Sequence, residues 1–216
     1  MSVSNSATDI VNLALDVIKT ENINDVEVPG TDKQAVVANR WYDDVRQKAL
    51  EGFPWNFAST RKSIPLNATA PSFGFDDAYV LPNNYLSLNF IKYWDYPLSR
   101  WNYVIEAGNI YMDNDGAESL DIGYVYDITQ PVKFSPSFKI YLAYSLAEKI
   151  VIKLTGNVAL AARITTSKKT EEVNARANNG KANPPVAYRQ SRMLAGRRIY
   201  GSSQTTRFST GQNGRI

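Results

Sequence analysis

Apolar residues in the first fifty positions recur at helical spacing, in two separate segments. The first segment runs from about Ala7 to Lys19, and its apolar face consists of Ile10, Leu13, Ala14, Val17 and Ile18. The second follows Thr31, and its apolar face consists of Ala35, Ala38, Tyr42, Val45 and Ala49. Ser6 with Asp9, and Thr31 with Gln34, have the spacing of capping boxes. The pattern predicts an antiparallel pair of helices that ends at Gly52 and Pro54.

The pattern changes between Trp55 and Thr129, where short runs rich in Tyr, Val, Ile, Trp and Phe alternate with turn residues. The predicted strands are Asn56–Ile64, Tyr79–Leu81, Leu86–Trp94, Tyr103–Ala107, Asn109–Met112 and Leu120–Tyr126. Ala107-Gly108-Asn109 and Asp113-Asn114-Asp115-Gly116 have the composition of hairpin turns between strands. This block predicts a small antiparallel β domain.

Helical spacing returns after Ser135, which is a predicted N-cap followed by Pro136 at the first helical position. The buried face of this third helix is predicted to contain Ile140, Ala143, Ala147, Ile150, Val151 and Leu154. Gly156 ends it, and Asn157 caps a fourth helix that we expect to reach about Ala177. Asn178-Asn179-Gly180 is the expected stop signal.

These elements predict an α+β fold: a helical bundle of two helix hairpins with an inserted small antiparallel β domain and an extended C-terminal arm. The expected parts are an N-terminal helix hairpin at 1–54, the β domain at 55–132, the C-terminal helix hairpin at 133–179 and the arm at 180–216. The arm has few aliphatic residues and many Gly, Ser, Thr, Asn and Arg, so it cannot form a core alone.

The net charge of +3 conceals an uneven distribution. Residues 181–216 carry seven basic side chains and no acid, whereas the preceding 180 residues carry 17 basic and 21 acidic ones. Aromatic residues that could anchor the arm are scattered among the arginines, which predicts that it orders on an anionic partner. The candidate partner-binding residues are Tyr188, Arg189, Arg192, Arg197, Arg198, Tyr200, Arg207 and Phe208. Contact of the same arginines with nucleic-acid phosphates remains an alternative.

The chain of 216 residues contains no His and no Cys, which excludes Ser-His-Asp triads, thiol nucleophiles and the common zinc sites. Asp113-Asn114-Asp115-Gly116 lacks the spacing of an EF-hand loop, so we expect no metal there. The pairs Asp43/Asp44 and Asp76/Asp77 leave a lytic, glycosidase-like activity as a minor alternative. The most apolar stretch, Ile140–Leu154, is interrupted by charges and too short to cross a bilayer. We therefore expect no enzyme activity, no cofactor and no membrane segment.

Several motifs, in order along the chain, resemble those of the tail tubular protein A family of short-tailed phages. They are Tyr42-Asp43-Asp44-Val45-Arg46, Phe53-Pro54-Trp55-Asn56-Phe57-Ala58, Tyr79-Val80-Leu81-Pro82-Asn83-Asn84-Tyr85-Leu86, Tyr103-Val104-Ile105-Glu106-Ala107-Gly108 and Leu154-Thr155-Gly156. The resemblance spans about residues 7 to 177. Two positions depart from it, because Asn84 stands where the family often has Asp and Ala107 interrupts a Glu-Gly pair.

The resemblance implies a head-to-tail adaptor, also called a gatekeeper or connector, in the virion tail at the portal vertex, assembled in the host cytoplasm. Such proteins form a dodecameric ring that binds the portal protein and the tail nozzle, which is a tail tubular protein B-like component. Double-stranded DNA leaves through the ring during ejection without sequence-specific binding. The family has a helical bundle with an inserted β domain and has no catalytic role. A nucleic-acid-binding protein that uses the basic C-terminal tail remains the alternative.

Overall fold

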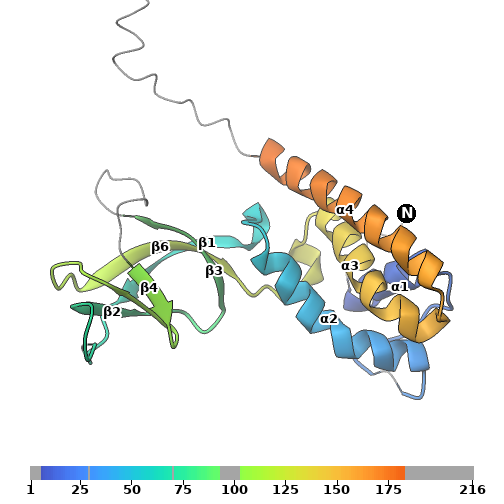
Figure 1. The fold of residues 1–216 in the computed structure, drawn as a ribbon, viewed down its shortest axis with the longest axis horizontal. Coiled ribbons are helices and arrows are strands. Elements are labelled where there is room, and N and C mark those ends of the chain that lie inside the picture. Colours follow the sequence, from blue (N-terminus) through green and yellow to red (C-terminus); the bar gives the residue numbers. More distant parts are fainter. Residues whose placement is uncertain (1–5, 29, 70, 93–102, 183–216) are drawn as a thin grey trace, which may run out of the picture. The chain divides into compact units, whose positions relative to one another are not determined.

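The computed structural model describes residues 6–28, 30–69, 71–92 and 103–182. Its helices are α1 Ala7–Ile18, α2 Lys33–Glu51, α3 Pro136–Thr155 and α4 Val158–Lys181, with short 3₁₀ turns at Asn56–Ala58 and Pro131–Lys133. Its strands are β1 Ser59–Pro65, β2 Asp77–Val80, β3 Tyr85–Lys92, β4 Tyr103–Glu106, β5 Asn109–Met112 and β6 Ser119–Tyr126. All six strands lie between α2 and α3 in the chain, which confirms the predicted α+β class with an inserted β part (Figure 1).

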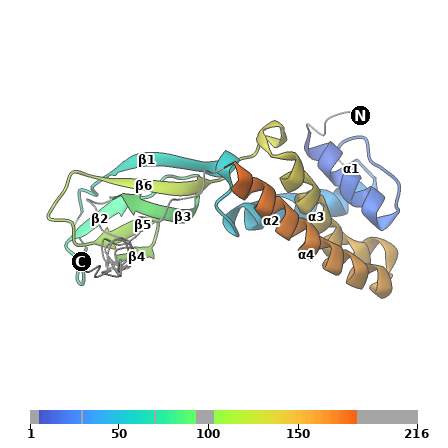
Figure 2. The same cartoon turned by 90° about the horizontal axis from the view of Figure 1, so that it is seen from above.

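Helix α3 is the centre of the helical part, because α1, α2 and α4 all pack against it. Figures 1 and 2 together show α4 on one side of α3 and the pair α1 and α2 on the other. This position explains the composition of α3, whose buried residues are Phe138, Lys139, Leu142, Ala143, Ser145, Leu146, Ala147, Ile150 and Val151. A helix covered on several sides needs apolar residues around most of its circumference.

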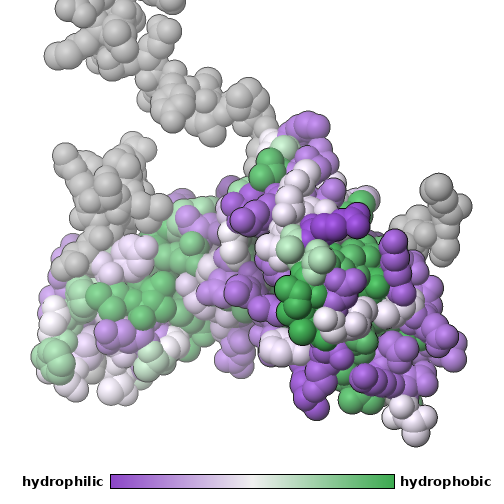
Figure 3. Space-filling model, turned by 45° about the vertical axis from the view of Figure 1, so that its right-hand side comes forward, coloured by the Kyte–Doolittle hydropathy of each residue, from purple (hydrophilic) through white to green (hydrophobic). Residues whose placement is uncertain are grey.

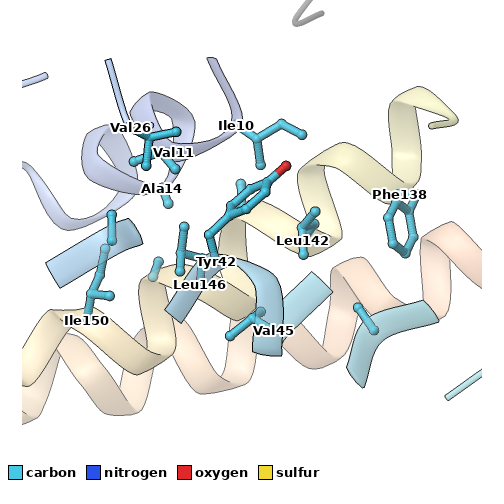
Figure 4. Packing of buried hydrophobic residues seen from close by; sticks show 14 of the residues in the cluster. Ile10, Val11, Ala14, Val26, Tyr42, Val45, Phe138, Leu142, Leu146 and Ile150 are labelled. Carbon is cyan, nitrogen blue, oxygen red and sulfur yellow. The ribbon is translucent and has the colours of Figure 1, made fainter. Parts of the chain in front are cut away.

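The helical core continues without a break into the end of the β part. Ile10, Val11 and Ala14 of α1 lie with Tyr42 of α2 and with residues of α3 in one cluster (Figure 4). Val125 at the end of β6 and Ile128 beyond it belong to the same cluster. The chain thus enters and leaves the β part through the helical core.

Most predicted helix boundaries are confirmed, including the ends at Gly52 and Gly156 and the cap at Asn157, and two are wrong. Ser6 and Asp9 form the expected capping box at α1, and Ser135 caps α3. The predicted box of Thr31 and Gln34 is absent, because α2 begins one residue later, with Asp32 at the N-cap. Helix α4 continues past the expected stop to Lys181, since the side chains of Asn178 and Asn179 bond to other segments.

The β part contains two three-stranded antiparallel sheets, in the orders β1-β6-β3 and β2-β5-β4. A second core lies within it, formed by Ile64, Tyr79, Leu81, Ile91, Ile110, Met112, Leu120, Ile122 and Tyr124. The predicted hairpin turn at Ala107-Gly108 is confirmed, and both residues have positive φ. The hairpin at 113–116 is wrong, because this turn connects β5 of one sheet to β6 of the other. The predicted strand from Asn56 begins three residues later, after a 3₁₀ turn.

Gly123 in the middle of β6 is required by a side chain that crosses the sheet. Its neighbours across the ladder are Arg61 on β1 and Phe90 on β3. A Cβ at position 123 would overlap the Phe90 ring. The Arg61 guanidinium lies 5.4 Å from the centroid of that ring, so ring and cation cover the glycine together.

We predict that Gly123→Ala destabilises the protein by about 1–3 kcal/mol, because Phe90 must leave its position over β6. The measurement is urea unfolding followed by circular dichroism. Gly180→Ala is the matched control, since nothing lies within 4 Å of a Cβ there and alanine favours the helix. Equal stability of Gly123→Ala and the parent protein would contradict the packing argument.

Tyr42 carries a polar atom into the helical core. Its hydroxyl is buried and has no hydrogen-bond partner within the described part of the chain. Figure 4 shows the hydroxyl directed away from α2, among apolar side chains. Burial raises the pKa of Tyr42 from 10.0 to about 12, despite the nearby Arg46. The neutral phenol is therefore the form that the fold accommodates.

We predict that Tyr42→Phe stabilises the protein by about 1 kcal/mol near neutral pH, because it removes an unpaired buried hydroxyl. A raised pKa in the folded state gives stability that is present below pH 10 and lost as pH rises towards 12. The advantage of Phe should grow by about 1 kcal/mol between about pH 9 and 11. Unfolding of both proteins in urea at each pH tests this, and a constant difference would contradict it.

Candidate interaction surfaces

The predicted docking residues of the arm lie outside the described residues. They are Tyr188, Arg189, Arg192, Arg197, Arg198, Tyr200, Arg207 and Phe208. The structure does describe the point from which the arm departs, since α4 ends at Lys181 and Ala182 is its C-cap. The residues that hold this end of α4 are therefore the first candidate functional feature.

Asn56 holds the last turn of α4 through two hydrogen bonds. Its backbone N–H donates to Oδ1 of Asn179, and its side-chain Nδ2 donates to the backbone carbonyl of Asn179, both at 2.9 Å. Asn178 Nδ2 donates to Oγ of Ser137 at the start of α3, at 2.8 Å. Two segments distant in sequence, at Asn56 and at Ser137, thus hold the last turns of α4, where the arm begins.

The aromatic residues around Asn56 provide a rigid base for these contacts. The Trp55 indole is buried, and its Nε1 donates to the carbonyl of Ala49 at 2.9 Å. Its ring meets that of Phe138 edge-on, with 4.9 Å between centroids. The Arg176 guanidinium of α4 lies 5.3 Å from the centroid of Phe53. The sequence predicted a helix end and a strand start in this segment, and a family resemblance, but not its contact with α4, because that contact spans more than a hundred residues.

Arg46 connects α2 to the chain that leaves the β part. Its side chain is only 3% exposed. One terminal nitrogen donates both to Asp127 Oδ1 and to the carbonyl of Ile128, the latter at 2.8 Å. The other terminal nitrogen donates to Asp43 Oδ1 at 3.2 Å, and Gln47 Nε2 donates to the second oxygen of Asp127 at 2.9 Å. We call Arg46, Asp43, Gln47 and Asp127 the joint cluster.

Arg46 keeps its charge in spite of burial. Burial alone would lower the pKa of Arg46, but the hydrogen bond and charge of Asp127, followed by those of Asp43, raise it above its ordinary value. A buried guanidinium whose donors are satisfied by two carboxylates and a carbonyl is fixed in position. The cluster therefore ties the orientation of α2 to the chain segment after β6.

One carboxylate of each acid pair considered for lytic chemistry has a structural partner. Asp43 belongs to the joint cluster, and Asp77 is buried with its Oδ2 accepting the backbone N–H groups of Asn114 and Gly116 at 2.9 and 3.0 Å. Asp113 in the same turn accepts the N–H of Asp76 at 3.0 Å. These carboxylates hold a helix and a turn. In the described part of the chain, no group of three or more acidic side chains could hold a metal ion.

The surface of the β part contains an open hollow of about 460 Å³, lined in part by Phe73, Phe75, Val104, Glu106 and Tyr111. The side chain of Phe73 is exposed at its edge. Figure 3 shows hydrophobic patches separated by hydrophilic side chains on the face it presents. Among the helices described, none has the length and apolar character needed to span a membrane.

No family model matches the chain, and no curated protein matches it. The motif residues and the contacts that they make therefore provide the main indication of function.

We predict that Arg46→Met destabilises the protein by about 3–5 kcal/mol, because it leaves Oδ1 of Asp127 and the carbonyl of Ile128 without the Arg46 donor. Arg46→Lys should also destabilise it, since one ammonium cannot reproduce the planar fork. Arg40→Met is the matched control, as Arg40 is exposed on the same helix. Urea unfolding measures the free energy of unfolding of the three variants. If Arg46→Met lowered it no more than Arg40→Met does, the role of the joint cluster would be contradicted.

Proposed function

We propose that this chain is a structural head-to-tail adaptor of a short-tailed phage virion. Its copies form a dodecameric ring that joins the portal protein to the tail nozzle and encloses the channel for double-stranded DNA. The protein acts through its geometry and uses no catalytic residue, metal or cofactor. Its place is the tail, at the portal vertex, after assembly in the host cytoplasm.

The observation that carries the proposal is the structural role of the motif residues behind the family resemblance. Arg46 of the first motif forms the joint cluster with Asp127. Trp55 and Asn56 of the second motif fill the core and hold the end of α4. The first motif lies where the helical part meets the chain leaving the β part, and the second holds the end of α4, where the arm begins. Residues at such a joint suit a protein that must hold two partners in a fixed relation.

A ring also needs each copy to contact two neighbours through different surfaces. The helical part supports this requirement, because α4 and the pair α1 and α2 lie on different sides of α3 (Figures 1 and 2). The arm adds a further contact to the portal, in which Tyr188, Tyr200 and Phe208 are anchors and the arginines pair with acids. Ordering one arm costs entropy, but many arms in one assembly contribute avidity.

DNA must slide through the channel, so tight base contacts would oppose the function. The excess of acidic over basic residues in the first 180 positions is consistent with a polar, weakly repelling channel wall. The basic arm is the feature that the alternative, a nucleic-acid-binding protein, would use. The two functions differ in what the arm binds, and this difference provides the test.

We predict that a protein ending at Ala182 stays folded but no longer co-sediments with portal rings. The described core lies within the first 182 residues, so its thermal unfolding should change little. A matched variant with the three arm aromatics changed to Ala, Y188A/Y200A/F208A, keeps every arginine and separates anchoring from charge. It should bind the portal more weakly than the parent chain because the anchors are missing.

Undiminished portal binding by the truncated protein would contradict the docking role of the arm. A gel shift of the full chain with double-stranded DNA at two salt concentrations completes the comparison. Strong binding that falls steeply with salt and disappears on truncation would favour the nucleic-acid-binding alternative.

A further inference from the structure

One side of α4 has no partner in the described structure. The helix has 24 residues, of which only Ile164 and Ala175 are buried, and both face α3. Val158 and Val173 on its outer side are 70% and 67% exposed. Thr166 and Thr170, also exposed, donate their hydroxyls to carbonyls of their own helix, so these donors are already used. The outer face of α4 therefore offers little for water to bind except its charges.

The charges on this outer face are positive. Arg163 and Lys169 are exposed and form no ion pair with any residue that the structure describes. Their neighbours differ, since Lys168 pairs with Glu148 at 2.7 Å and Arg176 pairs with Glu172 at 2.5 Å. We call Val158, Arg163, Thr166, Lys169 and Val173 the α4 face.

A surface of opposite charge lies on the other side of α3. The connection between α1 and α2 carries Glu21, Asp25 and Glu27, which are exposed and form no ion pair within the described ranges. Val28 beside them is 74% exposed. We call these four residues the acidic face. The same connection also carries the exposed Lys19 and Asp32, so it remains negative as a whole. Like the α4 face, the acidic face combines an exposed valine with an excess of charge of one sign.

The positive charge of the α4 face indicates which partner binds it. The chain's own C-terminal segment has seven basic residues and no acid from Lys181 onward, so it carries the same sign as the α4 face. A second copy packed α4 against α4 would also bring like charges together. The acidic face of a second copy has the complementary sign and matching exposed valines.

We propose that the α4 face of one copy docks on the acidic face of the next copy, in a head-to-tail contact. Because the two faces lie on different sides of α3, each copy keeps one face free after the first contact. A contact of this kind repeats from copy to copy and closes into a ring when the rotation allows it. The inference rests on the ring in the proposed function and names the surfaces that join its subunits.

Cysteine cross-linking tests the contact directly, because the chain has no Cys of its own. Val173→Cys and Val28→Cys proteins are treated with a short bismaleimide, separately and mixed, both in free solution and on portal rings. The mixture should give a cross-linked dimer, whereas Val173→Cys alone should give none. A dimer from Val173→Cys alone would indicate α4 against α4 and would overturn the proposal.

Charge reversal provides a second readout. R163E/K169E should weaken self-association about tenfold, and mixing it with D25K/E27K should restore association between the two variants. K62E/K133E, which reverses two exposed cations that belong to neither face, is the matched control and should have little effect. Equal weakening by the control, or no restoration on mixing, would overturn the assignment of the faces.

The outcomes separate this contact from the adaptor function. Portal co-sedimentation without the mixed cross-link, in solution and on the rings, overturns the faces and leaves the adaptor function standing. The mixed cross-link without portal binding supports the contact and contradicts the adaptor function. Loss of both contradicts both.

Discussion

The structure depends most on the burial of one charge. Arg46 lies where α2 meets the chain leaving β6, and its guanidinium is satisfied by Asp127, Asp43 and the carbonyl of Ile128. Such a cluster is not a strong source of stability, since desolvation opposes the attraction. The cluster instead fixes an orientation. The planar guanidinium of Arg46 reaches all of its acceptors in only one orientation of α2 relative to the chain segment after β6. A protein proposed to transmit position between two partners needs a constraint of this kind.

The central place of α3 determines which surfaces remain for partners. Because α1, α2 and α4 each pack on α3, its own apolar residues are used inside the fold. Helix α4 is packed on one side only and keeps Val158 and Val173 exposed. The same arrangement separates the α4 face from the acidic face, which a head-to-tail assembly requires. The internal packing and the proposed contacts between copies therefore both follow from the arrangement of α1, α2 and α4 around α3.

Local signals predicted the elements well where the chain itself supplies the bonding partner. The capping box of Ser6 with Asp9 and the hairpin turn at Ala107-Gly108 need only neighbouring residues, and both are present. One local prediction, the capping box of Thr31 with Gln34, was wrong by one residue, and two others were wrong because a distant partner decides the outcome. Asn178 and Asn179 resemble a stop signal, but bonds to Ser137 and Asn56 extend α4 past them. The turn at 113–116 was assigned to a hairpin, whereas Asp77 holds it between two sheets. The sequence indicated the arm as a candidate site, whereas the contacts that hold the end of α4, where the arm begins, were visible only in the structure.

The sequence by itself determined the α+β class, the order of elements and the basic arm, because periodicity and charge are local properties of the chain. It also removed every mechanism that needs His or Cys. Only the tertiary structure decided which residues form the joint cluster and which helix face lacks a partner. It also decided why position 123 must be glycine. Each of these depends on groups that are far apart in sequence, and their approach is set by packing that no local pattern records.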